Sequence, residues 1–208
     1  MTPHAPTRRR GGPAAPVLVL AAALAATLAG CGGGNPLDIP AEVANPPATG
    51  ARKLSFAYFQ RCVQPILEAQ LPITLHGNTT VNSCASSGCH DDSNGTGGAL
   101  RLRAGEALVD LGLSPEAIRA TGMYRNFYSS QGEVVLGDAL GSRLIAKPLV
   151  RGVLHGGGLI FEREDDPLVR VLRYWIENPM PGGQDEFSAA GNALFTPPDA
   201  ATGECNVE

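Results

Sequence analysis

The stretch "LSFAYFQRCVQPILEAQ", residues 54–70, carries the strongest fold signal in this chain of 208 residues. Its apolar side chains recur at the spacing of one helix face. They are Phe56, Phe59, Val63, Ile66 and Leu67. Pro65 interrupts this pattern because proline cannot donate the hydrogen bond of a helix interior, so we expect a kink or the end of the first half there. The stretch therefore predicts an amphipathic helix packed against a core.

Two more helices are predicted downstream from their start and stop signals. Ser114 is a suitable cap with Pro115 in the first turn. Asp166-Pro167 begins a second helix and Asn178-Pro179 ends it. Its apolar side is formed by Leu168, Leu172, Trp175 and Ile176. Long Gly-rich loops separate these segments and little strand is expected, so the sequence predicts a mainly α fold of few helices.

The N-terminus is typical of an exported protein. Residues 1–30 combine three arginines, Arg8, Arg9 and Arg10, with the short apolar segment "PVLVLAAALAATLAG", as in a signal peptide. Leu28-Ala29-Gly30-Cys31 resembles a bacterial lipobox, in which the cysteine is acylated and becomes the first residue of the mature chain. The alternative is an ordinary signal peptide followed by an unrelated cysteine. The lipobox predicts a membrane anchor and a bacterial envelope protein that faces the periplasm.

Composition divides the remaining chain into three parts. Residues 31–53 are rich in Gly, Pro and Ala, which predicts a flexible tether. Residues 54–187 are expected to form one domain, and residues 188–208 a C-terminal tail. Three of the 16 basic side chains precede Cys31 and all 20 acidic ones follow it, so the mature chain has a net charge of about −7. This charge argues against binding to nucleic acid.

The cysteine count allows two arrangements. Five cysteines are an odd number for an exported chain, but acylation of Cys31 would leave four. If Cys84 and Cys89 hold a cofactor, Cys62 and Cys205 remain, and an oxidising compartment favours a disulfide between them. That disulfide would fasten the tail to the first helix. The alternative joins Cys84 to Cys89 as a second disulfide and needs no cofactor.

Residues 84–90, "CASSGCH", place a histidine directly after the second cysteine. In c-type haem attachment, two cysteine sulfurs bond the vinyl groups and the following histidine binds the iron. The usual motif has two residues between the cysteines, whereas this one has four small or flexible ones. Zinc is a weaker alternative, because four ligands are needed and only His76 and His155 could add imidazoles. We therefore predict one covalently attached haem c held by Cys84, Cys89 and His90.

The order of several short motifs resembles the planctomycete-type cytochrome c domains. The matching segments, between about residues 54 and 180, are "PIL" at 65–67, "GGALRL" at 97–102, "SRL" at 142–144 and "LRYWI" at 172–176. The insertion "PITLHGNTTVNS", residues 72–83, departs from this family, in which the connection is usually short. The resemblance implies a small cytochrome c-like domain of few helices, with long Gly-rich loops around one haem.

The sixth iron ligand decides the expected chemistry. His155 in "RGVLHGGGLIF" lies in the loop before the last predicted helix, where many c-type cytochromes place this ligand. Met180 and Met123 are the alternatives, followed by His76 or an open site. Two histidines would make a six-coordinate iron of low potential, which describes an electron carrier rather than an enzyme. We expect redox partner proteins in the cell envelope. A haem enzyme or sensor, and a cofactor-free lipoprotein for binding or scaffolding, are the competing interpretations.

Overall fold

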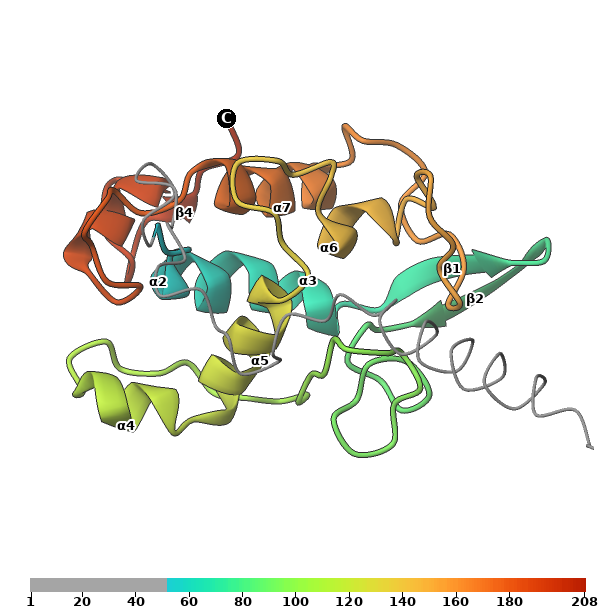
Figure 1. The fold of residues 1–208 in the computed structure, drawn as a ribbon, viewed down its shortest axis with the longest axis horizontal. Helices are drawn as coiled ribbons and strands as arrows, with labels where there is room; N and C mark the ends of the chain where they lie inside the picture. Colours follow the sequence, from blue (N-terminus) through green and yellow to red (C-terminus); the bar gives the residue numbers. More distant parts are fainter. Residues whose placement is uncertain (1–51) are drawn as a thin grey trace, which may run out of the picture. The chain divides into compact units, whose positions relative to one another are not determined.

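One helix, from Phe56 to Glu68, lies at the centre of the structure, a computed structural model that describes residues 52–208 (Figure 1). It comprises α2 (Phe56–Tyr58), the π-helical segment η1 (Phe59–Val63) and α3 (Gln64–Glu68). Ser55 caps its start by accepting a hydrogen bond from the Tyr58 backbone N–H at 3.2 Å. Pro65 lies in the first turn of α3, directly after the π-helical segment η1. In a π-helix the backbone hydrogen bonds join residues five positions apart instead of four. The helix therefore continues through the proline.

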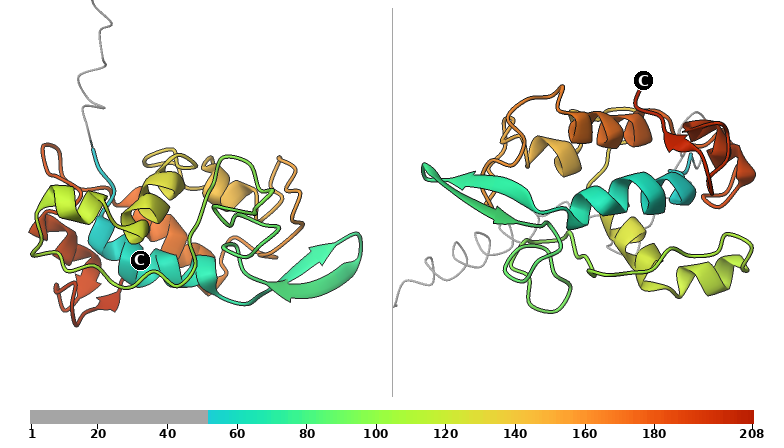
Figure 2. Two further views of the ribbon diagram at one scale, coloured as in Figure 1. Left: turned by 90° about the horizontal axis from the view of Figure 1, so that it is seen from below. Right: turned by 180° about the vertical axis from the view of Figure 1, so that it is seen from behind.

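Five further helical segments surround this central helix. They are α4 (Pro115–Arg119), α5 (Gly122–Gln131), α6 (Arg143–Ala146), α7 (Pro167–Glu177) and the 3-10 segment η2 (Ala189–Leu194). Both α5 and α7 contact η1, and the right-hand view of Figure 2 shows them on either side of the central helix. The predicted caps are confirmed, because Ser114 accepts from the Ala117 N–H at 3.3 Å and Asp166 from the Leu168 N–H at 2.8 Å.

A β-hairpin extends away from the helices (Figure 1). Its strands, β1 (Leu71–Leu75) and β2 (Asn78–Asn82), pair antiparallel with Leu71 opposite Asn82. The two turn residues, His76 and Gly77, have φ values of 49° and 78°, and positive φ at both positions is what the favoured two-residue hairpin turn requires. A second, shorter antiparallel pair joins β3 (Phe195–Thr196) to β4 (Glu204–Cys205).

The prediction of a mainly α fold is wrong. Among residues 52–208, 31% are helical and 12% lie in strands or bridges, which is a mixed α/β class. The largest difference is the insertion at residues 72–83, which the sequence analysis treats as a longer connection. Its β-branched residues, Ile73, Thr74, Thr79, Thr80 and Val81, lie on both sides of a His-Gly turn, and this composition favours paired strands.

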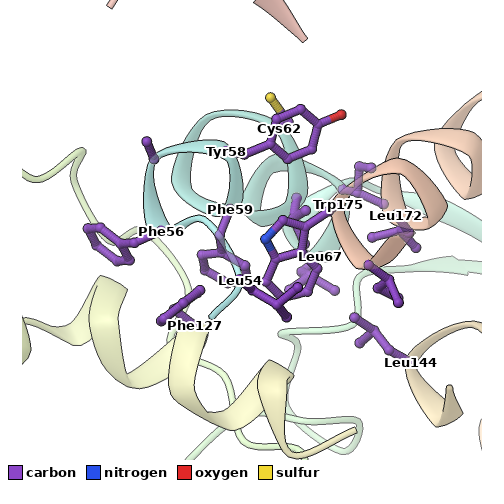
Figure 3. Close-up of a cluster of buried hydrophobic side chains, with 14 of the residues drawn as sticks. Leu54, Phe56, Tyr58, Phe59, Cys62, Leu67, Phe127, Leu144, Leu172 and Trp175 are labelled. Carbon is purple, nitrogen blue, oxygen red and sulfur yellow. The ribbon is translucent and has the colours of Figure 1, made fainter. Parts of the chain in front are cut away.

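The core is aromatic and packs around the first half of the central helix (Figure 3). Trp175 from α7 lies 5.5 Å from the ring of Phe59 and 6.1 Å from that of Phe127, measured between ring centroids. Phe56 meets the ring of Phe127 edge-on at 5.3 Å. The indole N–H of Trp175 donates to the carbonyl of Ser55 at 3.0 Å, so its one polar atom is satisfied in the core.

The C-terminal tail is a packed part of this structure. Cys62 in η1 and Cys205 in β4 form a disulfide, with Cα atoms 6.0 Å apart. The Tyr58 hydroxyl donates to the carbonyl of Asn206, and the Arg61 guanidinium donates to the carbonyl of Gly203 at 3.2 Å. The tail is therefore fixed to the central helix at several points.

The predicted signal peptide at residues 1–30, the lipobox with Cys31 and nearly all of the 31–53 tether lie outside the described residues. Within residues 52–208, no helix combines the length and apolar character needed to cross a membrane.

Candidate functional site

A cavity of about 340 Å³ lies beside the second half of the central helix. Its apolar wall comes from several elements and includes Ile66, Leu67, Ile73, Leu100, Leu144, Ile160, Phe161 and Leu172. Its polar lining includes Cys84, Cys89, His90, Glu133, Arg143, Lys147 and His155. An apolar hollow with a few polar groups is typical of a site for a small molecule or cofactor.

The motif loop, residues 84–90, is fixed to the end of the central helix. The backbone N–H of Ala85 donates to the carbonyl of Leu67 at 3.1 Å. The backbone N–H of His90 donates back to the carbonyl of Cys84 at 2.9 Å, which closes the loop. These two bonds place both cysteines and His90 at the same wall of the cavity.

The ring of His90 is held by the segment that follows the motif. Its Nδ1 lies 3.2 Å from the carbonyl oxygen of Leu100. Gly97 leaves space for this ring, because a Cβ atom at position 97 would come within 2.4 Å of Nδ1. The Gly97 backbone N–H also donates to the carbonyl of Cys89 at 2.7 Å. Gly97, the first glycine of "GGALRL", therefore allows the backbone to pass close to the imidazole.

The β-hairpin positions His155. Thr74 in β1 and Leu159 exchange two backbone hydrogen bonds, of 2.8 and 2.9 Å, which fasten the loop of His155 to the hairpin edge. Gly158 is needed at this contact, since its φ is +89° and a Cβ atom would lie 2.5 Å from the Thr74 carbonyl oxygen. The Nδ1 atom of His155 lies 2.7 Å from the carbonyl oxygen of Gly158. The insertion thus serves as the support for a candidate ligand.

The His90 and His155 rings both line the cavity and lie in nearly parallel planes. Their centroids are 6.2 Å apart and their planes differ by 12°. Imidazoles that bind one metal ion from opposite sides, through nitrogens at about 2 Å, have ring centres roughly 6 Å apart. Both Nδ1 atoms contact backbone carbonyls, which is how proteins fix ligating histidines with Nε2 available for the metal. Both residues therefore leave Nε2 free for a metal ion, and their ring centres have the separation expected of two imidazoles bound to one iron.

Burial shifts the pKa values of two site residues, His90 and Cys84. Burial lowers the pKa of His90, against an opposing effect of its contact with Leu100, so its neutral, metal-binding form is favoured. Burial raises the pKa of the Cys84 thiol to about 11, so this side chain is a neutral thiol at pH 7. Cys84 and Cys89 are both free in the structure.

The structure separates the candidate ligands into two groups. Cys84, Cys89, His90 and His155 line one cavity. Met123 and Met180 are each 1% exposed and do not line it. His76 is exposed in the turn of the hairpin, also away from the cavity. Of the possible sixth ligands, only His155 is therefore placed opposite His90.

Three charged cavity residues were missed by the sequence analysis: Glu133, Arg143 and Lys147. Arg143 and Lys147 are four residues apart, the spacing at which helical side chains share a face, and this spacing was the available signal. Glu133 precedes no regular element and carries no such signal. Among the described residues, no cluster of three or more His, Cys, Asp or Glu side chains is grouped to hold a metal ion; a haem iron takes its equatorial ligands from the porphyrin and needs only axial side chains.

Comparisons of the chain with protein-family models, with curated proteins and with solved structures find no match. The resemblance to planctomycete-type cytochrome c domains stays a prediction.

Proposed function

We propose that this chain is an envelope-anchored monohaem c-type cytochrome that carries electrons. Cys84 and Cys89 would hold the haem covalently, with His90 and His155 as the two axial ligands. The lipid on Cys31 would fix the domain to a membrane, and redox proteins of the cell envelope would be its partners.

The facing histidines carry this proposal. Two imidazoles from different loops have ring centres 6.2 Å apart, which is about the separation expected for two histidines that bind one iron. The residues of the motif loop add two free thiols on the same cavity. This combination of two thiols and two imidazoles matches the donor set of a bis-histidine c-type haem.

The residues of the chain would have separate roles around the cofactor. Each thiol would add its S–H across one vinyl double bond, so that sulfur bonds one carbon, hydrogen goes to the other, and no group leaves. His90 and His155 would hold the iron six-coordinate, which excludes oxygen and favours a low potential. The apolar wall, with Leu144, Phe161 and Leu172, would exclude water from one face. A bound haem supplies a reversible one-electron couple, and the protein sets its potential.

Mass spectrometry and absorbance of the full chain test this proposal, after production in a bacterial host that attaches c-type haem. We expect an added haem mass and a low-spin six-coordinate spectrum. Replacing both cysteines, Cys84→Ser with Cys89→Ser, should remove the covalent mass. His155→Ala should keep the mass and convert the spectrum to high spin, because one axial position opens.

His76→Ala is the matched control, since His76 lies outside the cavity and its loss should leave the spectrum unchanged. A colourless chain with no added mass and a Cys84–Cys89 disulfide would reject the cytochrome in favour of a cofactor-free lipoprotein. A high-spin spectrum in the unaltered chain, with binding of external ligands, would indicate a haem enzyme or sensor.

A further inference from the structure

Two cations line the cavity without a partner among residues 52–208. Arg143 begins α6 and Lys147 caps its end, so one turn of helix places both at the cavity wall. Neither side chain forms an ion pair or hydrogen bond with another described residue. Several other arginines are paired, as Arg151 is with Glu164 at 2.7 Å.

One carboxylate of the chain lies on the same wall. Glu133 is 8% exposed, and its backbone carbonyl accepts from the N–H of Leu144 in α6 at 3.0 Å. No ion pair within 4 Å joins Glu133 to Arg143 or Lys147. The wall therefore presents two positive charges against one negative charge, which leaves an excess that an anionic ligand can neutralise.

We propose that Arg143 and Lys147 bind the carboxylates of the ligand in this cavity, a clamp that rests on the proposed function because haem carries two propionates at one edge. A guanidinium is suited to this, since its planar donors match both oxygens of a carboxylate. Lys147 adds a second positive charge on the same side. The clamp fixes which edge of the macrocycle points towards α6.

Binding of two probes, one with free propionates and one with both propionates esterified, tests the clamp. The full chain carrying Cys84→Ser and Cys89→Ser, which cannot form thioethers, is titrated with haemin and with haemin dimethyl ester. We expect at least tenfold tighter binding of the diacid. Adding Arg143→Gln and Lys147→Gln should reduce that preference to near unity, whereas Arg125→Gln and Lys53→Gln, which change exposed cations outside the cavity, should keep it.

A second measurement on the matured protein does not depend on non-covalent binding. Removing the two positive charges next to the cofactor favours its oxidised form, so Arg143→Gln with Lys147→Gln should lower the midpoint potential, and the Arg125 and Lys53 pair should not. Equal binding of the two probes would reject the clamp but not the cytochrome proposal. An unshifted midpoint potential in a double variant that carries haem would do the same. Absence of haem mass in the unaltered matured chain overturns the proposed function instead.

Discussion

The aromatic core packs on the first half of the central helix and the cavity lies beside its second half, and the two regions differ in whether side chains fill the space. Phe59, Phe127 and Trp175 fill the core with side chains that are each 0% exposed. At the cavity end, an apolar wall together with glycines, cysteines, histidines and charged residues lines a hollow of about 340 Å³. Its loops are held by backbone hydrogen bonds, such as those between Thr74 and Leu159.

The comparison suggests separate roles: the core stabilises the domain, and the residues around the cavity determine the shape of the site. Burial of apolar side chains stabilises the core. The loops around the cavity are held by backbone hydrogen bonds instead, so the cavity stays unfilled by side chains. Substitutions in the core should therefore cost stability, and substitutions around the cavity should mainly alter what it can hold. Substitutions in each region test this division, and the largest effect is expected in the core.

The largest loss of stability is expected from Trp175→Ala. The substitution removes a fully buried ring that packs on Phe59 and Phe127 and donates to Ser55. Such truncations cost about 3–5 kcal/mol. Urea denaturation of the full chain should report this loss, and Leu154→Ala, at a side chain that is 91% exposed, should change the free energy of unfolding by less than about 0.5 kcal/mol. Similar losses of unfolding free energy in Trp175→Ala and Leu154→Ala would contradict the view that the core stabilises the domain.

Loss of the disulfide is expected to have the second-largest effect. Cys62 and Cys205 are separated by 143 positions, so the bond constrains a long segment of the unfolded chain. Replacing both by serine should lower the free energy of unfolding by about 2–5 kcal/mol. The same denaturation measurement checks this, with the reduced unaltered chain as the control. Reduction without any change in stability would show that the tail is held by its hydrogen bonds alone.

Two glycines of the cavity wall should respond differently to the same added methyl group. In Gly97→Ala the new Cβ would lie 2.4 Å from Nδ1 of His90, and such overpacking costs about 1–3 kcal/mol. In Gly156→Ala nothing lies within 4 Å of the new Cβ, so the change should stay within about 0.5 kcal/mol. Thermal unfolding compares the pair. A large loss at Gly156 would mean that protein atoms fill the cavity.

The smallest effect concerns a polar contact at the edge of the core and depends on pH. Glu186 accepts from Arg119 at 2.9 Å and from the Tyr124 hydroxyl at 3.2 Å. Burial by itself raises the pKa of Glu186, but hydrogen bonds from its own backbone N–H and from Arg119 outweigh this, so the pKa lies below 4.5. The carboxylate therefore stabilises the fold above pH 4.5, and this contribution is lost as the pH falls through the lowered pKa.

Glu186→Gln should accordingly cost about 1 kcal/mol near pH 7, because Arg119 is partly exposed and solvent screens the pair. The cost should shrink in acid, which urea denaturation at a series of pH values will measure. Glu164→Gln is the control, since Glu164 forms an exposed pair with Arg151. A cost that stays constant with pH would mean that the Glu186 charge contributes nothing.

Local features of the fold could be predicted because the residues concerned are neighbours in sequence. Ser114 and Asp166 cap helices within three residues of themselves, and such capping depends only on local geometry. The hairpin of residues 71–82 was missed even though its turn and β-branched residues were available. In β1 the burial alternates, with Leu71 and Ile73 buried and Pro72 exposed, but β2 has four exposed positions out of five. Strand formation there is set by cross-strand pairing rather than by burial.

By itself, the sequence determined the central helix, the two capped helices and the adjacency of Cys84, Cys89 and His90 to one another. Only the tertiary structure decided that His155, and not Met123 or Met180, lies opposite His90. The physical reason is that this meeting depends on backbone bonds between the hairpin and a distant loop, at Thr74 and Leu159. Contacts between segments far apart in the chain leave no local pattern, so residue types alone could name candidates but could not bring them together.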